Sequence, residues 1–279
     1  MAGTECQGKS CCSNILVPGG TFPMGCTMDE NCYSDEFPEH DATVADFYLD
    51  EYETTVGRFR QFVQQYDGTP LLDGAGAHPL ISGSGWQAEW NSQLPSSQFE
   101  LISNLKCHSS YQTWTDAPGS NEAYPVNCVS WFEAFAFCAW DGGRLPTEAE
   151  WEYASAGGGE NRRYPWGQQE PDATRSNFYG SDHSPFIDVG SHPVGGGRWG
   201  HRDLAGSMWE WTLDWYSSLW YSGAGNSCDH CANITNESRR VRRGGSWNSS
   251  ATYLRTTNRR SRTPVNHSHY IGFRCARTP

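Results

Sequence analysis

The spacing of apolar residues along the chain predicts two helices. One follows Thr54 or Thr55, either of which can cap it, and its apolar face consists of Val56, Phe59, Phe62 and Val63. The other is capped by Ser130 and runs to Trp140, with apolar positions at Ala134, Phe137 and Cys138. A third helix start is predicted by a capping box over residues 147–150 (TEAE), in which threonine and glutamate satisfy each other's backbone amides.

The β-like segments are short and are separated by turn-forming residues. Residues 16–24 (LVPGGTFPM) predict a strand broken at Pro-Gly-Gly, and residues 43–52 predict a second strand. Residues 67–127 are rich in Gly, Pro and Ser and predict a long irregular insertion. We therefore expect a single α+β domain over residues 15–279 with little regular secondary structure, preceded by a Cys-containing tail at residues 1–14.

The composition narrows the class of protein. The 279 residues carry a net charge of −12, which argues against nonspecific binding to nucleic acid or to anionic membranes and is compatible with divalent cations. No run approaches the roughly 18 apolar residues that a membrane span needs. The 13 Trp residues provide enough apolar surface for a packed core, and we expect a monomer.

Eleven cysteines are many for this length, and several are close in sequence, as in Cys26/Cys32 and Cys228/Cys231. Disulfides in an oxidising compartment are one interpretation, with Cys26–Cys32 and Cys228–Cys231 as local bridges. Zinc at Cys228-Asp-His-Cys231 is the alternative, although no second close pair follows at a suitable distance. Since no signal peptide opens the chain, the expectation of an extracytoplasmic protein rests on the cysteines.

Eight short motifs occur in an order that resembles the formylglycine-generating enzyme (sulfatase-modifying factor) family. They are residues 17–25 (VPGGTFPMG), 47–56 (FYLDEYETTV), 125–131 (PVNCVSW), 143–153 (GRLPTEAEWEY), 164–167 (YPWG), 203–211 (DLAGSMWEW), 243–247 (RGGSW) and 272–275 (GFRC). The resemblance implies a variant of the C-type-lectin fold with calcium bound in loops. It also implies a disulfide between Cys138 and Cys275.

Two carboxylates in the sixth motif suggest a calcium site. Asp203 and Glu210 flank a Gly-containing turn, and calcium takes about six to eight oxygen ligands. A capped turn that leads into an aromatic strand is the purely structural alternative. The resemblance implies side-chain ligands at Asp203, where the family usually has Asn, and Glu210, with carbonyl ligands at Gly206 and Met208.

A second calcium site of the family begins at a pair that resembles Asn177-Phe178. The aspartate ligand of that site falls at or near Phe186 here, which leaves Asp182 or Asp188 as substitutes.

The copper ligands of the family are missing. Its enzymes oxidise a substrate cysteine with copper(I) held by two cysteines that follow the Arg-Gly-Gly-Ser motif. Those two positions hold Ser249 and Leu254 here, whereas the pocket neighbours Trp209 and Ser246 match. Because copper(I) prefers soft thiolates, we expect no copper and no formylglycine synthesis by the known route. Whether the chain is an enzyme thus stays open.

A related branch of the family makes sulfoxides with iron on three histidines, which come mainly from a helical domain with a His-x3-His-x-Glu pattern that this chain lacks. The pair His267-Ser-His269 could share a metal, but two histidines in a polar surface loop are the simpler interpretation.

Residues 248–270 have the composition of a recognition surface. They are rich in Asn, Ser, Thr, Tyr, His and Arg and resemble the variable region of lectin-fold ligand-binding proteins. We expect this segment to bind a protein or a small molecule through Tyr253, Arg255, Arg259, Arg262, His267 and Tyr270. The run over residues 239–243 (RRVRR) is interpreted as basic residues that pack and pair with carboxylates.

Overall fold

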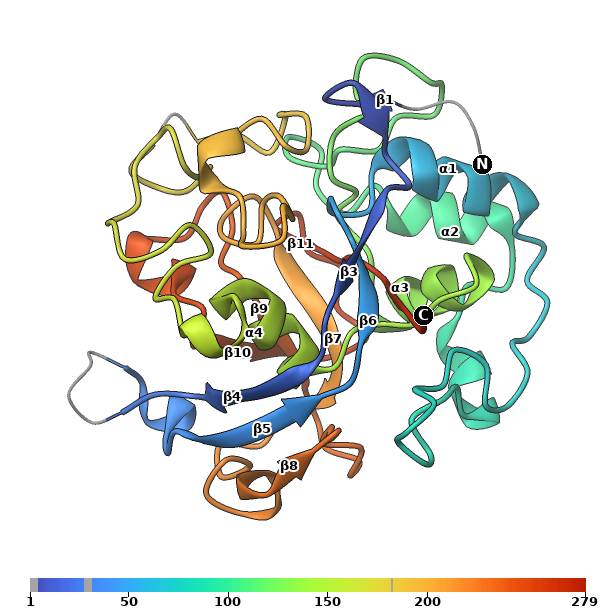
Figure 1. Ribbon diagram of the computed structural model, residues 1–279. Helices are drawn as coiled ribbons and strands as arrows, with labels where there is room; N and C mark the ends of the chain where they lie inside the picture. Colours follow the sequence, from blue (N-terminus) through green and yellow to red (C-terminus); the bar gives the residue numbers. More distant parts are fainter. Residues whose placement is uncertain (1–4, 28–31, 182) are drawn as a thin grey trace.

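The computed structural model describes residues 5–27, 32–181 and 183–279. Figure 1 shows its α-helices α1 to α3 gathered on one side of the molecule and strands β4, β5 and β8 on the other. The α-helices are α1 (Val56–Gln65), α2 (Gln98–Asn104), α3 (Trp131–Trp140) and α4 (Glu148–Ala156). Short 3-10 helices occur at η1 (Ser34–Glu36), η2 (Ala88–Gln93), η3 (Gly158–Glu160), η4 (Pro193–Gly195), η5 (Ala224–Asn226) and η6 (Ala251–Leu254).

The predicted helix starts are confirmed by side-chain caps. The Thr55, Ser130 and Thr147 side chains accept hydrogen bonds from backbone amides in the first turns of α1, α3 and α4. The Ser130 and Thr147 caps are complete capping boxes. The predicted insertion at 67–127 is mostly irregular but also contains α2 and η2. In the described part of the chain, no helix has the length and apolar character to cross a bilayer.

Four small sheets make up the β structure of the described residues. The central sheet has the order β10-β9-β7-β11, a second has β12-β6-β3, a third has β4-β5-β8, and β1 pairs with β2. The strands are β1 (Glu5–Cys6), β2 (Lys9–Ser10), β3 (Asn14–Val17), β4 (Gly20–Met24), β5 (His40–Val44), β6 (Phe47–Asp50), β7 (Trp209–Trp215), β8 (Cys228–Asp229), β9 (Arg240–Arg243), β10 (Arg259–Arg262), β11 (Ile271–Gly272) and β12 (Ala276–Arg277). The α+β prediction is confirmed, and the segment predicted as one strand at 43–52 is divided between β5 and β6.

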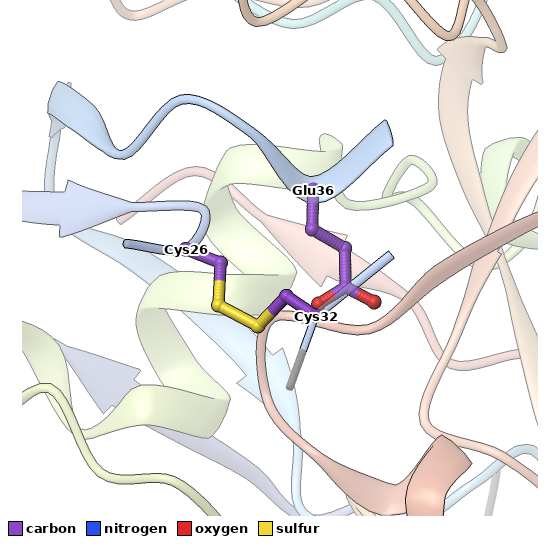
Figure 2. Close-up of side chains that lie close together, drawn as sticks. All are labelled: Cys26, Cys32 and Glu36. Carbon is purple, nitrogen blue, oxygen red and sulfur yellow. A yellow bond between two sulfur atoms is a disulfide. The ribbon is translucent and has the colours of Figure 1, made fainter. Parts of the chain in front are cut away.

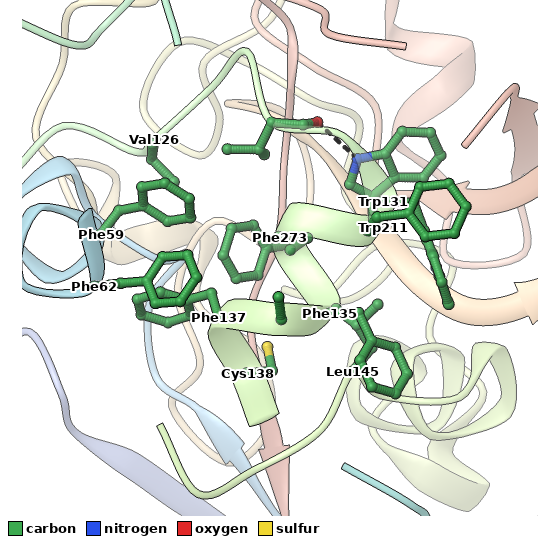
Figure 3. Close-up of a cluster of buried hydrophobic side chains, with 14 of the residues drawn as sticks. Phe59, Phe62, Val126, Trp131, Phe135, Phe137, Cys138, Leu145, Trp211 and Phe273 are labelled. Carbon is green, nitrogen blue, oxygen red and sulfur yellow. Dashed lines mark hydrogen bonds between the residues drawn. The ribbon is translucent and has the colours of Figure 1, made fainter. Parts of the chain in front are cut away.

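Aromatic side chains fill the main core between α1, α3 and β7 (Figure 3). Phe59 of α1 stacks on Phe137 of α3 with ring centroids 5.4 Å apart, and Phe273 meets Phe137 edge-on at the same distance. Two buried indole nitrogens are satisfied: Trp131 donates to the Thr212 carbonyl at 2.7 Å and Trp211 to the Val129 carbonyl at 3.2 Å. The aromatic positions of the predicted helices therefore face one shared core.

Five disulfides join the described residues. They are Cys6–Cys11, Cys26–Cys32, Cys107–Cys128, Cys138–Cys275 and Cys228–Cys231. The local bridges and the Cys138–Cys275 bridge are as predicted, whereas Cys107–Cys128 was not anticipated. The Cys228–Cys231 bond leaves no thiolate pair for the zinc alternative. In the predicted tail, Cys6 and Cys11 pack against Tyr52 and Val189.

Candidate functional site

Three carboxylates lie beside the start of β7; those of Glu53 and Glu210 are buried and that of Asp203 is partly buried. Glu53 precedes α1, whereas Asp203 and Glu210 flank the turn that enters β7, and Glu53 and Glu210 are 0% and 1% exposed. The turn needs a glycine at Gly206: its φ is +82°, and a Cβ there would lie 2.4 Å from the Asn177 carbonyl oxygen. Close packing against Asn177 thus holds the turn, and with it Asp203, in place.

Each carboxylate already has protein partners. Glu53 accepts from the Ser207 hydroxyl at 2.8 Å and from the Met208 amide at 2.9 Å. Glu210 accepts from Arg274 at 2.7 and 2.8 Å, and Asp203 accepts from the Gly190 amide. Glu53 was not predicted from the sequence, although it stands within the motif at residues 47–56.

The charge of this cluster is unbalanced. Burial and the nearby Asp203 and Glu210 raise the pKa of Glu53 well above its usual value. Burial likewise raises the pKa of Asp203. Within the described residues, Arg274 is the guanidinium that acts on both Glu53 and Asp203, and His192 also acts on Asp203. Full ionisation of the three carboxylates would therefore give the cluster an excess of negative charge. Hard oxygen donors with excess negative charge suit a divalent cation such as calcium.

The residues of the second implied calcium site make local contacts instead. The Asn177 side-chain oxygen accepts from the Ser184 amide at 3.1 Å, and the Phe178 carbonyl accepts from the Ser181 hydroxyl at 2.7 Å. Asp188 is exposed, and no contact within the described ranges joins it to Asn177 or Phe178. Asp182 lies outside the described residues. The described contacts lend this second site no support.

A cavity of about 370 Å³ opens beside Trp209. It lies between β9, β10 and the segment after the Arg-Gly-Gly-Ser motif. Its lining residues are Trp209, Arg242, Asn248, Ser249, Ser250, Tyr253, Arg260 and Tyr270. The lining holds two arginines and no carboxylate, and its volume suits a small molecule.

The two positions that correspond to copper ligands differ in their surroundings. Ser249 lines the cavity and its hydroxyl lies 3.0 Å from the Ser246 hydroxyl, which is fully buried beneath it. Leu254 is 1% exposed and packs in a cluster with Tyr164, Phe178 and Ala205, outside the cavity lining. A hydroxyl and a buried aliphatic side chain do not form a copper(I) site.

The predicted binding residues separate into two groups. Tyr253 and Tyr270 line the cavity, and Arg262 is partly buried nearby on β10. The expectation that Arg255 and Arg259 face a partner is wrong. Arg255 donates to Glu36 at 2.8 and 3.0 Å, and Arg259 donates to Glu148 at 2.7 and 2.8 Å, because each balances a buried carboxylate.

The two loop histidines point to different partners. His267 lies 2.9 Å from the Glu133 carboxylate, and this contact outweighs burial to raise the pKa of His267. The His269 ring instead packs on that of His108, with centroids 4.4 Å apart. These contacts do not support a metal shared by His267 and His269.

Within the described ranges, Cys26, Cys32 and Glu36 form the one group of three His, Cys, Asp or Glu side chains whose ligand atoms all lie within 4.8 Å of one another (Figure 2). The carboxylate oxygens of Glu53, Asp203 and Glu210 are more widely spaced than this. The two sulfurs of the Cys26, Cys32 and Glu36 group are bonded to each other, and Glu36 is already paired with Arg255. In this oxidised state the group is structural and provides no metal site.

The chain is similar in sequence and in structure to proteins of one known family. The model of the sulfatase-modifying factor enzyme 1-like domain matches residues 2–279. The chain is 31% identical to a formylglycine-generating enzyme of Streptomyces coelicolor, over 98% of this chain and 92% of that protein. It is also 31% identical to a bovine protein named inactive C-alpha-formylglycine-generating enzyme 2, over 94% and 87%. The structure of PvdO from Pseudomonas aeruginosa superposes with a TM-score of 0.69 at 26% identity, over 95% of this chain and 94% of that one. The chain belongs to the sulfatase-modifying factor family.

Proposed function

We propose that this protein is a ligand-binding member of the family that does not carry out copper-dependent cysteine oxidation. The observation that carries the proposal is the pair Ser249 and Leu254 at the ligand positions, with Leu254 buried outside the cavity. The cavity beside Trp209 would then bind a ligand without transforming it. The bovine relative, which is named inactive, makes such a member plausible.

The alternative is an oxidoreductase with a changed active site. It is favoured by the Streptomyces relative, which is named as an enzyme, and by the retention of Trp209 and Ser246 around the cavity. Such an enzyme would need metal ligands other than those at positions 249 and 254. The two proposals therefore differ in whether the protein carries out metal-dependent oxidation, of which copper-dependent oxidation of a cysteine is the form known for formylglycine formation.

A copper titration distinguishes them. We expect no stoichiometric copper(I) uptake in competition with a chelator and no aldehyde on a Cys-containing sulfatase peptide, because the thiolate pair is missing. Mass spectrometry of the peptide and metal analysis of the protein provide the two readouts, with a copper-loaded formylglycine-generating enzyme as positive control. Uptake of about one copper(I) together with aldehyde formation would contradict the proposal.

We also propose that calcium occupies the carboxylate cluster and that the protein is extracytoplasmic. Glu53 joins Asp203 and Glu210 as a candidate side-chain ligand, with the carbonyls of Gly206 and Met208 as further donors. Bound calcium would neutralise charge and stabilise the turn into β7. The five disulfides support an oxidising compartment.

Removal of calcium should destabilise the protein in a pH-dependent way. The pKa values of Glu53 and Asp203 lie above their ordinary 4.5 and 3.8 in the folded calcium-free protein, so folding then favours their protonated forms. Without calcium the free energy of unfolding therefore falls as pH rises above about 4. Because calcium binds the ionised carboxylates, the loss of Tm in excess EDTA should grow from pH 5 to pH 7.5.

The matched variants are Glu53→Gln, which should shrink the EDTA effect, and Glu237→Gln, which changes an exposed glutamate and should not. Melts that are identical with calcium and with EDTA at both pH values would rule out the calcium proposal.

A further inference from the structure

We propose that the cavity beside Trp209 binds a small molecule that carries an oxyanion on a planar, unsaturated body. The oxyanion is a carboxylate, sulfate or phosphate. This inference rests on the proposed ligand-binding function and specifies the chemistry of the ligand. It follows from the distribution of charge on strands β9 and β10.

Strands β9 and β10 place arginines directly opposite one another. Arg260 pairs with Arg242 in the antiparallel register, and Arg262 pairs with Arg240. Side chains at opposed positions lie on the same face of a sheet, and like charges in that arrangement are unfavourable. One face of this strand pair therefore concentrates four guanidinium groups.

The opposite face of the same strands has a different arrangement. There Arg243 is paired with Glu152 and Arg259 with Glu148, both glutamates being on α4. On the four-arginine face, by contrast, no carboxylate in the described ranges forms an ion pair with Arg240, Arg242, Arg260 or Arg262. Ion pairs balance the arginines on the α4 side. On the other face Arg240 lies over the rings of Trp131 and Trp215, whereas Arg242 and Arg260 line the cavity.

Arg242 is the clearest sign of a missing anion. Its Nε and Nη1 atoms are buried and have no acceptor within the described part of the chain. Its guanidinium lies 4.6 Å from the centroid of the Trp209 ring. Burial, together with Arg262 and Arg260, outweighs the opposing effect of Tyr270 and lowers the pKa of Arg242 to about 10. An oxyanion bound in the cavity would pair with this guanidinium and offset the repulsion.

Arg260 is held in place by aromatic rings. Its guanidinium lies 3.8 Å from the ring centroid of Tyr33 and 5.0 Å from that of Tyr253, and the two tyrosine rings are parallel within 6°. Tyr253 also meets Trp209 edge-on at 6.0 Å. These flat surfaces favour a planar ligand body, while Asn248, Ser249 and Ser250 add neutral hydrogen-bonding groups to the lining.

Calorimetry with a matched series of probes tests this inference on the calcium-loaded protein. The probes are 4-nitrobenzoate, 4-nitrophenyl sulfate, 4-nitrophenyl phosphate and neutral 4-nitrobenzamide, with inorganic sulfate and phosphate. We expect at least one aryl anion to bind about tenfold or more tightly than the amide and the inorganic ions, and the preferred anion identifies the oxyanion. Raising the ionic strength from about 0.02 to about 0.3 M should weaken that binding.

Variants locate the site. Arg242→Gln and Arg260→Gln should each weaken binding of the preferred anion about tenfold or more. Arg239→Gln changes an exposed arginine next to β9 and should leave the affinity unchanged. If a glutamine variant fails to fold, the same contact can be tested in the unchanged protein with a reagent that modifies arginines covalently. The preferred anion should protect Arg242 from this reagent, which peptide mapping detects.

The outcomes separate this inference from the proposed function. The anion assignment is overturned if 4-nitrobenzamide binds as tightly as the preferred anion, or if the Arg242→Gln/Arg260→Gln protein keeps the full affinity for that anion. Either result leaves the proposed ligand-binding function intact. Failure of every probe to bind also overturns the inference. The proposed function itself fails on a different measurement, namely copper uptake with aldehyde formation.

Discussion

Replacing both Cys138 and Cys275 by alanine should lower the free energy of unfolding by about 4–5 kcal/mol. The bridge joins residues 137 apart in sequence and ties α3 to the segment before β12. In the chain-entropy model, opening so large a loop restores much conformational freedom to the unfolded chain. Both cysteines are fully buried, so alanine leaves little exposed surface to complicate the comparison.

The matched control is the Cys228→Ala/Cys231→Ala protein, which loses a bridge of sequence separation 3. The same model assigns that bridge only about 1–2 kcal/mol. Urea unfolding of both proteins, with the slope of each transition recorded, provides the measurement. Equal losses in the two variants would show that loop length does not govern stability here.

The second large effect is expected at Arg259. Methionine at this position leaves the Glu148 carboxylate buried without its two-point partner, and should lower the free energy of unfolding by about 3–5 kcal/mol. Arg243 lies 3.6 Å from Glu148 but is engaged mainly by Glu152, so it compensates only in part. Loss of partner binding by an Arg259 variant would thus reflect unfolding and not a lost contact surface.

A double variant separates the pair from the packing around it. Glu148→Gln combined with Arg259→Met removes both charges and should recover a large part of the loss. Arg163→Met, which changes an exposed arginine paired with Glu170, should alter stability by less than about 1 kcal/mol. A double variant no more stable than the single one would assign the loss to the Tyr221 and backbone contacts of Arg259.

Local signals in the sequence predicted the parts of the fold that depend on neighbours in the chain. The caps at Thr55, Ser130 and Thr147 and the short-range bridge Cys228–Cys231 are decided within a few residues. The bridge Cys107–Cys128 gave no comparable signal, because its cysteines are joined across an irregular insertion. The position of Cys138–Cys275 came from the family resemblance and not from spacing.

Local sequence signals also predicted part of the candidate site. Asp203 and Glu210 stand in one motif, and Tyr253 and Tyr270 in the segment 248–270, whose composition is typical of a recognition surface. The approach of Glu53 to Asp203 instead spans the chain and has no local signature.

The interpretation of the basic run at residues 239–243 as residues that pack and pair with carboxylates holds in both parts for Arg243, which pairs with Glu152. Arg242 packs on Trp209 but forms no ion pair with a carboxylate of the described residues. Side chains alternate between the two faces along β9, so Arg242 and Arg243 lie on opposite faces. The sequence does not show which residues of β10 lie beside each of them, because that depends on the register of the two strands.

The last strands have a consequence for how the protein is made. Residues 271–277 contribute β11 to the central sheet, β12 beside β6, Arg274 to the carboxylate cluster and Cys275 to the long disulfide. Ribosomes add residues in order, so the partners of these groups, including β6 and α3, emerge well before them. Folding can be completed only after residue 277 has left the ribosomal tunnel. Until then, the nascent chain exposes the aromatic surface that Phe273 covers, and Cys138 can form a disulfide with a wrong cysteine. We therefore expect the supply of chaperones and disulfide isomerases to limit the yield of expression.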